Sequence, residues 1–466
     1  MQTDQYHRIL EYLRKTIEGT KWQGHVFAVG GCCRDEILGN EIKDVDLAVD
    51  LAGGGIGLAC WFYENGLAVK EPVTFPSFGT AMLRLREFPD DEIEIVQTRA
   101  EKYTDRTRRD PTVVFGPIEQ DCRRRDLTIN ALYYDISNSR LLDILGCSID
   151  DIHNCIIRTP DDPDTTFDDD PVRILRAIRL ASRYGWEIEP ATFEGMAKNV
   201  HRLKIVRPER MQAEVEKMLV GPHPSAAMDL MRRCGAVPYI FPGLEGLFDL
   251  RQGTGSSPDA WQFTMLVLDR TRPDLALRLA ALLHDIAKPL CRKTGKNGGA
   301  YFPGHERRSK ALIDTAMRRL HFDRKIIDRV IFLSSNHLAT KTWGPTAENM
   351  TDAALRRLQH KCTTPRRFDM LMELIDADNK SYTSPQPEQV AAVRRRSEEL
   401  QKEGMALFSF KHQVNMQRLR KTIGASPDDD MKPYLDFLLQ LAINNPRMSR
   451  DKVLKELKKF RPIKKK

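Results

Sequence analysis

The chain has 466 residues, which is long for a single hydrophobic core and indicates two to four domains. It carries 73 lysine and arginine residues against 65 aspartate and glutamate residues, and 41% of its residues are hydrophobic. This composition is ordinary for a globular protein, and the net charge of +8 suggests an anionic partner. No apolar run approaches the length of a membrane span, and the polar N-terminus lacks the apolar core of a signal peptide. We therefore expect no membrane association.

The cysteines limit both the compartment and the possible metal sites. There are nine, and none of them shows paired Cys-x-x-Cys spacing. Neither a zinc site nor a disulfide framework is therefore indicated. A cytoplasmic enzyme with free thiols is the simplest interpretation.

The order of predicted elements indicates the fold class. A helix is expected near the N-terminus, because Ile9, Leu10, Leu13 and Ile17 recur at helical spacing. Strand-like segments follow at residues 26–29, 45–49, 80–85, 93–96 and 132–135. From about Asp170 the pattern is helical almost to the end of the chain. We predict an α+β protein with an α/β head followed by a long helical body.

Shifts in composition suggest where the domains end. Residues 253–258 are rich in glycine and serine and predict a domain border, whereas residues 101–117 are highly charged and predict a mobile loop. Residues 452–466 contain eight basic residues and one acidic residue, which suits either contact with a phosphate backbone or a solubilising terminus. We predict four domains: a head at 1–150, a helical domain at 151–250, a second helical domain at 251–380 and a helical tail at 381–466.

Two neighbouring motifs in the head predict phosphate chemistry. Gly30 and Gly31 follow a strand and precede an expected helix start at Arg34 and Asp35, so backbone there can approach a phosphate. Nine residues further on, the side chains of Asp44 and Asp46 project the same way from the second strand and can hold two divalent ions. Two ions about 3.5–4 Å apart can activate a hydroxyl and neutralise a leaving pyrophosphate. For either motif alone, a turn and a solvated strand would be the simpler interpretation.

Further charged residues of the head are candidates for the same site. On the third strand, Glu94 is either a third metal ligand or part of an exposed strand face that it shares with Glu92. Arg123, Arg124 and Arg125 lead into Asp126 and an apolar segment. Three adjacent cations repel unless an anion or a ribose hydroxyl receives them, so a nucleotide fits, with a basic surface turn as the alternative.

A charged segment at residues 168–179 predicts recognition of a nucleobase. Asp168 to Pro171 are expected to start a helix, on which Arg173, Arg176 and Arg179 recur every three residues. An aspartate one turn before an arginine offers an acceptor and two parallel donors, which suit the edges of cytosine and adenine. A capped amphipathic helix is the alternative. Glu209, Arg210 and Glu214 are expected to open the next helix, and Glu209 and Arg210 are expected to support this one.

Taken together, these motifs resemble the class II tRNA nucleotidyltransferase and bacterial poly(A) polymerase family over about residues 26–219. The resemblance implies a polymerase-beta-like nucleotidyltransferase head, a neck that contacts base and RNA, and addition of CMP and AMP from CTP and ATP to the 3′ end of tRNA with release of pyrophosphate. It implies Mg²⁺ as the cofactor, held by Asp44 and Asp46. It further implies the following nucleotide contacts: Gly30, Gly31 and Arg34 at the triphosphate; Arg124, Arg125 and Asp126 at the ribose side; Asp170 and Arg173 at the base, with Arg176 and Arg179 on the same helix. Asp169 stands where the family often has glutamate.

A second, weaker resemblance lies near residues 260–380. His284 and Asp285 match the doublet of HD phosphohydrolases, and further candidate metal ligands are His305, His337 and either Asp376 or Asp378. Phe263 stands where such domains usually supply a histidine. A degenerate or structural HD-type domain is therefore favoured over a working phosphohydrolase.

Alternative functions follow from the same motifs. Within enzymes, the rivals are a poly(A) polymerase and a partial enzyme that adds only CC or only A. A metal-dependent HD phosphohydrolase and a non-catalytic RNA-binding protein are rivals of other classes. RNA contact is expected to be spread over the helical body, where the candidates are Arg366, Arg367 and the final lysines.

Overall fold

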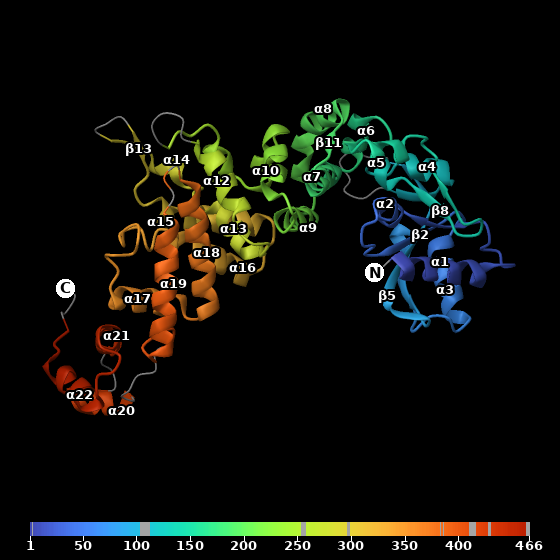
Figure 1. Ribbon diagram of the computed structural model, residues 1–466. Helices are drawn as coiled ribbons and strands as arrows, with labels where there is room; N and C mark the ends of the chain where they lie inside the picture. Colours follow the sequence, from blue (N-terminus) through green and yellow to red (C-terminus); the bar gives the residue numbers. More distant parts are fainter. Residues whose placement is uncertain are drawn as a thin grey trace. The chain divides into compact units, whose positions relative to one another are not determined.

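The computed structural model describes residues 1–466 except 2, 103–111, 253–257, 296–298, 383, 385, 410–415, 427–429 and 463–466. It divides into two compact units, Met1–Pro242 and Gly243–Lys466. The first unit contains the main sheet and the second is built from helices (Figure 1), so the predicted α+β order is confirmed. The unit border lies near the domain border predicted at residue 250, whereas the finer borders at 150 and 380 stay predictions. The predicted loops at 101–117 and 253–258 and the final lysines fall largely outside the described residues.

A seven-stranded mixed sheet forms the base of the first unit, in the order β3-β4-β5-β2-β1-β8-β9. Neighbouring strands are antiparallel except β2 and β5, which run parallel. All four residues of β1 are buried, as the apolar run predicts. The strands are β1 (Val26–Val29), β2 (Val45–Val49), β3 (Val73–Phe75), β4 (Thr80–Leu85), β5 (Phe88–Gln97), β8 (Tyr133–Asp135) and β9 (Arg140–Leu142).

Helices and short strand pairs complete this unit. The apolar residues of α1 predicted from their spacing are all buried. The helices are α1 (Thr3–Ile17), α2 (Gly31–Ile37), α3 (Gly54–Glu64), α4 (Ile118–Arg123), α5 (Ser148–His153), α6 (Pro163–Asp169), α7 (Val172–Tyr184), α8 (Pro190–Asn199), α9 (Pro208–Leu219), α10 (Pro224–Arg233) and α11 (Val237–Ile240), with 3-10 turns η1 (Pro76–Phe78), η2 (Thr128–Asn130) and η3 (Val200–Ile205). The short strands are β6 (Arg99–Lys102), β7 (Thr112–Phe115), β10 (Ile156–Ile157) and β11 (Glu187–Ile188).

The helix start predicted at Asp168 is wrong. Asp168 and Asp169 end α6, whose first turn is capped by Asp162 through a 2.9 Å hydrogen bond from the backbone N–H of Thr165. Asp170 is extended, because the following Pro171 disfavours helical backbone at the preceding residue. Helix α7 therefore begins only at Val172.

The second unit is helical apart from a small hairpin. An Asp259 capping box, in which Gln262 bonds back to the backbone, starts α12. Helices α20–α22 bury a cluster of their own that includes Leu419, Leu438 and Leu457. The elements are η4 (Leu244–Leu247), α12 (Ala260–Asp269), α13 (Leu275–Leu283), α14 (Lys288–Cys291), β12 (Lys293–Thr294), β13 (Ala300–Tyr301), α15 (His305–Arg319), α16 (Arg324–Asn336), α17 (Asp352–Cys362), α18 (Pro365–Ser381), α19 (Pro387–Lys402), α20 (Met416–Ile423), α21 (Lys432–Asn444) and α22 (Arg450–Lys459).

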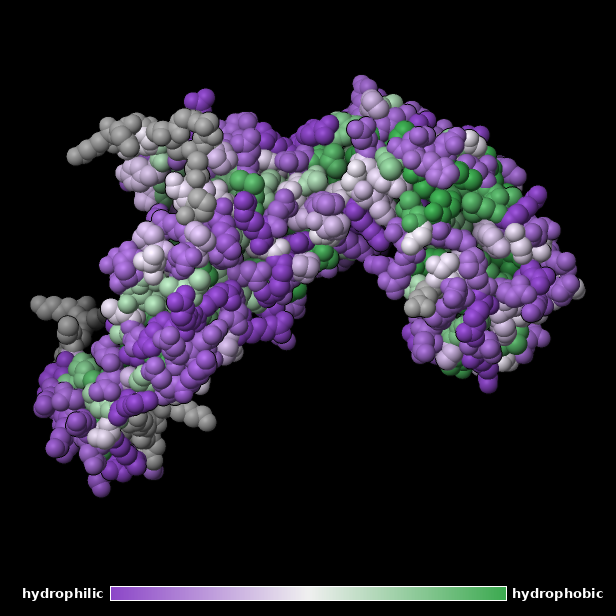
Figure 2. Space-filling model, in the orientation of Figure 1, coloured by the Kyte–Doolittle hydropathy of each residue, from purple (hydrophilic) through white to green (hydrophobic). Residues whose placement is uncertain are grey.

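The surface of each unit is mainly hydrophilic on the face that Figure 2 shows, as expected for amphipathic helices that bury one apolar stripe. None of the helices that the structure describes is long and apolar enough to cross a membrane.

Candidate active site

The turn between β1 and α2 brings backbone and a buried ion pair together. Gly30 has φ +79°, a conformation that side chains rarely adopt, and a Cβ there would meet a guanidinium nitrogen of Arg125 at 3.4 Å. Helix α2 begins at Gly31, one turn earlier than expected. Arg34 donates from Nε and Nη2 to Asp35 at 3.0 Å each, and both side chains are buried. The turn therefore presents a fixed arginine.

Three carboxylates of the head lie on or beside the parallel strands β2 and β5. Asp46 on β2 is the register partner of Glu94 on β5, and Asp44 immediately precedes β2. Asp46 is half-buried, whereas Asp44 and Glu94 are exposed. Burial, together with the nearby charges of Glu94 and Asp44, raises the pKa of Asp46 to about 6. Carboxylate oxygens are the ligands that Mg²⁺ prefers, so Asp44, Asp46 and Glu94 are candidate ligands for a divalent ion.

One cavity of about 490 Å³ joins the glycine turn to the carboxylates. Its wall includes Gly31, Arg34, Asp44 and Asp46 from the head, and Arg179 from α7. The structure thus brings together the residues predicted for triphosphate and metal. It also adds five residues with polar side chains that sequence reasoning missed: Lys43, Ser182, Arg183, Lys217 and His223.

The arginines of the second motif have partners inside the protein. Arg124 Nε and Arg125 Nη2 each donate to the buried carboxylate of Asp121, both at 3.1 Å. Asp126 accepts from Arg176 Nε at 2.6 Å and from Asn130 Nδ2 at 3.1 Å. The carboxylate of Asp121 on α4 therefore supplies an anion to Arg124 and Arg125.

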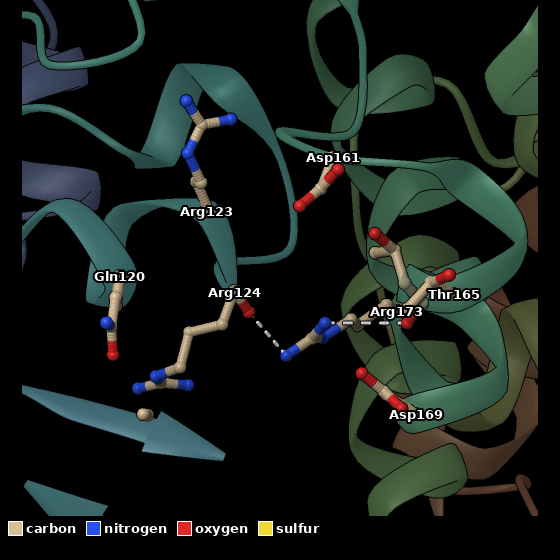
Figure 3. Close-up of a pocket in the computed structure, with 9 residues that line it drawn as sticks. Gln120, Arg123, Arg124, Asp161, Thr165, Asp169 and Arg173 are labelled. Atoms are coloured by element: carbon tan, nitrogen blue, oxygen red, sulfur yellow. Dashed lines mark hydrogen bonds between the residues drawn. The ribbon is translucent and has the colours of Figure 1, made fainter. Parts of the chain in front are cut away.

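The two residues predicted to read the base do not pair with each other. Arg173 donates to the backbone carbonyl of Arg124 at 2.6 Å and to that of Thr166 at 3.4 Å (Figure 3). Asp170 accepts hydrogen bonds from both terminal nitrogens of Arg210, at 3.1 and 2.7 Å. Beside Arg173 lies a second cavity of about 230 Å³, whose lining includes Gln120, Arg123, Asp161, Thr165 and Asp169.

Helix α9 holds α7 at two points. Arg210 pairs with Asp170 just before α7, and Glu214 pairs with Arg179 in its last two turns. Both side chains of the second pair are largely buried, with exposed fractions of 15% for Arg179 and 8% for Glu214. The two carboxylate–arginine pairs fix the face of α7 that carries the predicted nucleotide contacts.

Two family models and several known proteins match this chain. The family model "Poly A polymerase head domain" matches residues 26–158, and "Probable RNA and SrmB- binding site of polymerase A" matches residues 185–247. The "Multifunctional CCA protein" of Nitrosomonas europaea is 30% identical over 322 residues, which cover 67% of this chain and 73% of that protein. The chain belongs to the class II tRNA nucleotidyltransferase and poly(A) polymerase family.

Other members of the family share only part of their length with it. The mitochondrial CCA tRNA nucleotidyltransferase of Saccharomyces cerevisiae is 34% identical over 229 residues, 46% of this chain. The match spans about two fifths of that yeast protein, 41% of its length.

Solved structures of the family support the fold. The CCA-adding enzyme of Bacillus stearothermophilus in complex with CTP has a TM-score of 0.64 at 20% identity and 98% coverage of both chains. The Thermotoga maritima enzyme in complex with tRNA has a TM-score of 0.59 at 18% identity, with 97% of this chain and 95% of that chain covered. At these identities, the likeness shows that the fold is shared.

A second cluster of candidate ligands lies in the other unit, around His284 at the end of α13. His284 Nε2 lies 3.0 Å from Asp285 Oδ2 and 3.5 Å from Asp378 Oδ1, and His305 Nε2 lies 3.0 Å from Asp285 Oδ1. Among the described residues, His284, Asp285 and His337 form the one group of three potential ligands with all ligand atoms within 4.8 Å. Of the two aspartates left open by the sequence, Asp378 lies here.

The histidine rings are oriented by backbone carbonyls. The Nδ1 atoms of His284, His305 and His337 lie 2.8, 2.7 and 2.6 Å from the carbonyl oxygens three residues earlier. Their Nε2 atoms are therefore turned toward the centre of the cluster, an orientation typical of metal ligands. The Nε2 atoms of His284 and His305 are buried, and each lies 3.0 Å from a carboxylate oxygen of Asp285.

The charges of the cluster are strongly coupled. Burial disfavours the charged ring of His284, but Asp285 and Asp378 outweigh it and raise its pKa to about 10. Burial and the neighbouring His284 lower the pKa of His337 to about 4. The Lys288 ammonium also contacts Asp285, and the Phe263 ring lies 6.3 Å from that of His284. The raised pKa favours the charged form of His284 beside the carboxylates of Asp285 and Asp378.

Proposed function

We propose that the chain is a CCA tRNA nucleotidyltransferase, which adds CMP and AMP from CTP and ATP to the 3′ end of tRNA and releases pyrophosphate. The observation that carries the proposal is the single cavity lined by Gly31, Arg34, Asp44 and Asp46 together with Arg179 of α7. Phosphate-binding backbone, carboxylates and an arginine helix are thus next to one another. Two relatives carry "CCA tRNA nucleotidyltransferase" and "Multifunctional CCA protein" in their names, which supports this proposal.

The roles of the head residues follow from their chemistry. Asp44 and Asp46, with Glu94 beside them, would hold Mg²⁺, which supplies charge neutralisation and an acidified primer hydroxyl when bound. Gly30, Gly31 and Arg34 would bind the triphosphate through backbone N–H groups and the guanidinium. Arg124, Arg125 and Asp126 would lie on the ribose side, and Arg176 and Arg179 would complete the nucleotide site.

The base would be selected by Asp170 and Arg173. In the structure, Asp170 accepts from Arg210 and Arg173 donates to backbone carbonyls, so both would exchange partners when a nucleotide binds. Arg173→Ala should then relax selection of C and A over U. The measurement is incorporation from CTP, ATP and UTP, and an unchanged preference would contradict side-chain reading of the base.

The main experiment follows incorporation of labelled CTP and ATP into tRNA ending before C, after C and after CC. A complete CCA enzyme extends all three substrates and stops after A. A CC-only or A-only enzyme extends some of them, and a poly(A) polymerase continues beyond one A. Asp46→Asn should abolish incorporation with little change in the melting temperature, whereas a silent RNA-binding protein would show no incorporation in the wild type.

A second function is supported by the histidine cluster of the other unit. We propose that His284, Asp285, His305, His337 and Asp378 form an HD-type site for one divalent transition metal, because nitrogen-rich donor sets favour such ions over Mg²⁺. A bound ion would supply an activated water for hydrolysis of a phosphate ester. The convergence of the buried ligand atoms of His284, Asp285 and His337 within 4.8 Å favours this over the purely structural role suggested by Phe263.

Metal analysis distinguishes a metal-binding phosphohydrolase site from a purely structural cluster. The wild type should retain divalent metal after dialysis and hydrolyse p-nitrophenyl phosphate when metal is present, and His284→Ala should lose both properties. His360→Ala on α17 is the matched control. Metal-free wild-type protein without phosphatase activity would leave the cluster a structural one.

We also propose a cytoplasmic location. All nine cysteines are free thiols in the structure, which is usual in a reducing compartment. A Saccharomyces cerevisiae relative carries "mitochondrial" in its name. Fractionation of cells expressing the full-length protein tests the proposal, and recovery in an organelle would contradict it.

A further inference from the structure

Tyr184, the last residue of α7, contacts the turn between β1 and α2, named here the phosphate turn after its proposed role. Its hydroxyl donates to Asp35 Oδ1 at 2.8 Å, and its ring lies 5.5 Å from the guanidinium carbon of Arg34. Tyr184 is half-buried, and burial raises the pKa of its hydroxyl, so it remains a proton donor at neutral pH. None of the motifs in the sequence indicated this residue.

The contact is one end of a continuous chain of polar side chains. Asp35 accepts from Arg34 as well as from Tyr184, and Arg34 Nη1 donates to Asn130. Asn130 donates to Asp126, which accepts from Arg176. Arg176 lies on α7, eight residues before Tyr184 and about 12 Å away at 1.5 Å per residue. These hydrogen bonds therefore connect Tyr184 to Arg176 of the same helix through residues of the head.

The position of Arg34 is determined by these contacts. A guanidinium has five N–H donors, and three of those of Arg34 are used by Asp35 and Asn130. Two donors remain, and Arg34 lines the cavity that contains the carboxylates. Because Tyr184 shares the Asp35 oxygen with Arg34 Nε, it restrains the carboxylate on which the guanidinium rests.

We propose that Tyr184 is a positioning residue that aligns Arg34 with the triphosphate and couples the phosphate turn to the base-reading helix α7. The inference rests on the proposed function for its substrates. It assigns Tyr184 an effect on phosphate binding that is independent of which base is present, since the residues of the head that it contacts, Arg34 and Asp35, belong to the turn after β1. Its ring also lies 5.2 Å from the guanidinium carbon of the preceding residue, Arg183.

Tyr184→Phe tests the hydroxyl while keeping the ring beside Arg34. We expect the KM for CTP, the KM for ATP and the inhibition constant of inorganic tripolyphosphate to rise by the same factor, about tenfold, as for loss of a hydrogen bond to a charged group. The kcat should fall less than the KM rises. Tyr239→Phe is the matched control, because this half-buried tyrosine of α11 makes no hydroxyl hydrogen bond with the described residues.

Three results would overturn the inference. They are an unchanged KM and inhibition constant, different factors for CTP and ATP, and a fall in kcat alone with a lower melting temperature, which indicates a structural role. A double-mutant cycle adds a further check: in an Asp35→Asn background, Tyr184→Phe should have little additional effect. Direct calorimetry of tripolyphosphate binding tests Tyr184 even if the wild type adds no nucleotide to tRNA, so the two proposals fail separately.

Discussion

Glu94 and Glu92 lie two residues apart on the same face of β5, yet the structure places them differently. Glu94 is the register partner of Asp46, whereas Glu92 lies 3.7 Å from Arg84 at the surface. Glu94→Gln should lower nucleotide incorporation at least tenfold and increase the Mg²⁺ concentration needed for half-maximal activity, because it removes a charge beside the proposed metal site. Titration of activity against Mg²⁺ measures this.

Glu92→Gln is the matched control for that experiment, and its activity should remain close to that of the wild type. Equal loss in both variants would mean that the polar face of β5 acts as a whole, and Glu94 would then have no specific place at the ions.

At the scale of the element, α7 depends on α9. Removing the charge of Glu214 in Glu214→Gln leaves Arg179 largely buried without an anion, which should lower the free energy of unfolding by about 1–3 kcal/mol. Differential scanning calorimetry measures the change. Glu194→Gln on the exposed face of α8 is the control, and a melting temperature equal to the wild type in both variants would show that the buried pair contributes nothing.

Low pH should lower the stability of the head through two buried carboxylates, Asp121 and Asp126. Burial alone would raise the pKa of Asp121 and of Asp126, but Arg125 and Arg124 outweigh it for Asp121, and Arg176 does so for Asp126, so both pKa values lie below the ordinary value. A lowered pKa contributes stability above the unfolded value of ~3.9, which is lost as the pH falls through the folded pKa. Stability should therefore fall below about pH 4.

Calorimetry at pH 7 and at pH 3.5 checks this acid sensitivity. Asp126→Asn should be less stable than the wild type at pH 7 and should lose less stability between pH 7 and pH 3.5, by up to about 0.7 kcal/mol, because pH 3.5 lies only just below the unfolded pKa of ~3.9. A parallel decline of the two proteins would mean that other carboxylates dominate.

The strands of the head were predictable because each apolar run is buried in the sheet. The strands at 26–29, 45–49 and 80–85 agree with the structure to the residue, and α1 has the expected buried face. The start of α7 was not predictable, because aspartates before a proline suit both the end of one helix and the start of the next.

The contacts of the site were predictable only where they are local. Asp121 precedes Arg124 and Arg125 by three and four residues on or beside α4, so helical spacing would have revealed that pairing. Lys217 lines the cavity and Tyr184 contacts the turn after β1 only because α7 and α9 fold against the head, and nothing in their neighbouring residues indicates it.

For the whole molecule, the modest basic excess of +8 matters for RNA more than for nucleotide. Binding of tRNA should involve many contacts between lysine or arginine side chains and phosphates. The KM for tRNA should therefore rise steeply between 50 and 200 mM salt, by about tenfold or more. The KM for CTP should change much less. Steady-state kinetics at several salt concentrations measures both, and equal slopes would contradict a distributed RNA surface.

The parallel pairing of β2 with β5 limits how this family member can change. Val45, Leu47, Ile93 and Ile95 face the core, and Asp46 and Glu94 face the other way. Inserting or deleting one residue within either strand would reverse its two faces, turning acids inward and aliphatic groups toward the cavity. Length variation among descendants of this sequence should therefore accumulate in the connections, while these two segments tolerate substitutions but no change in residue count.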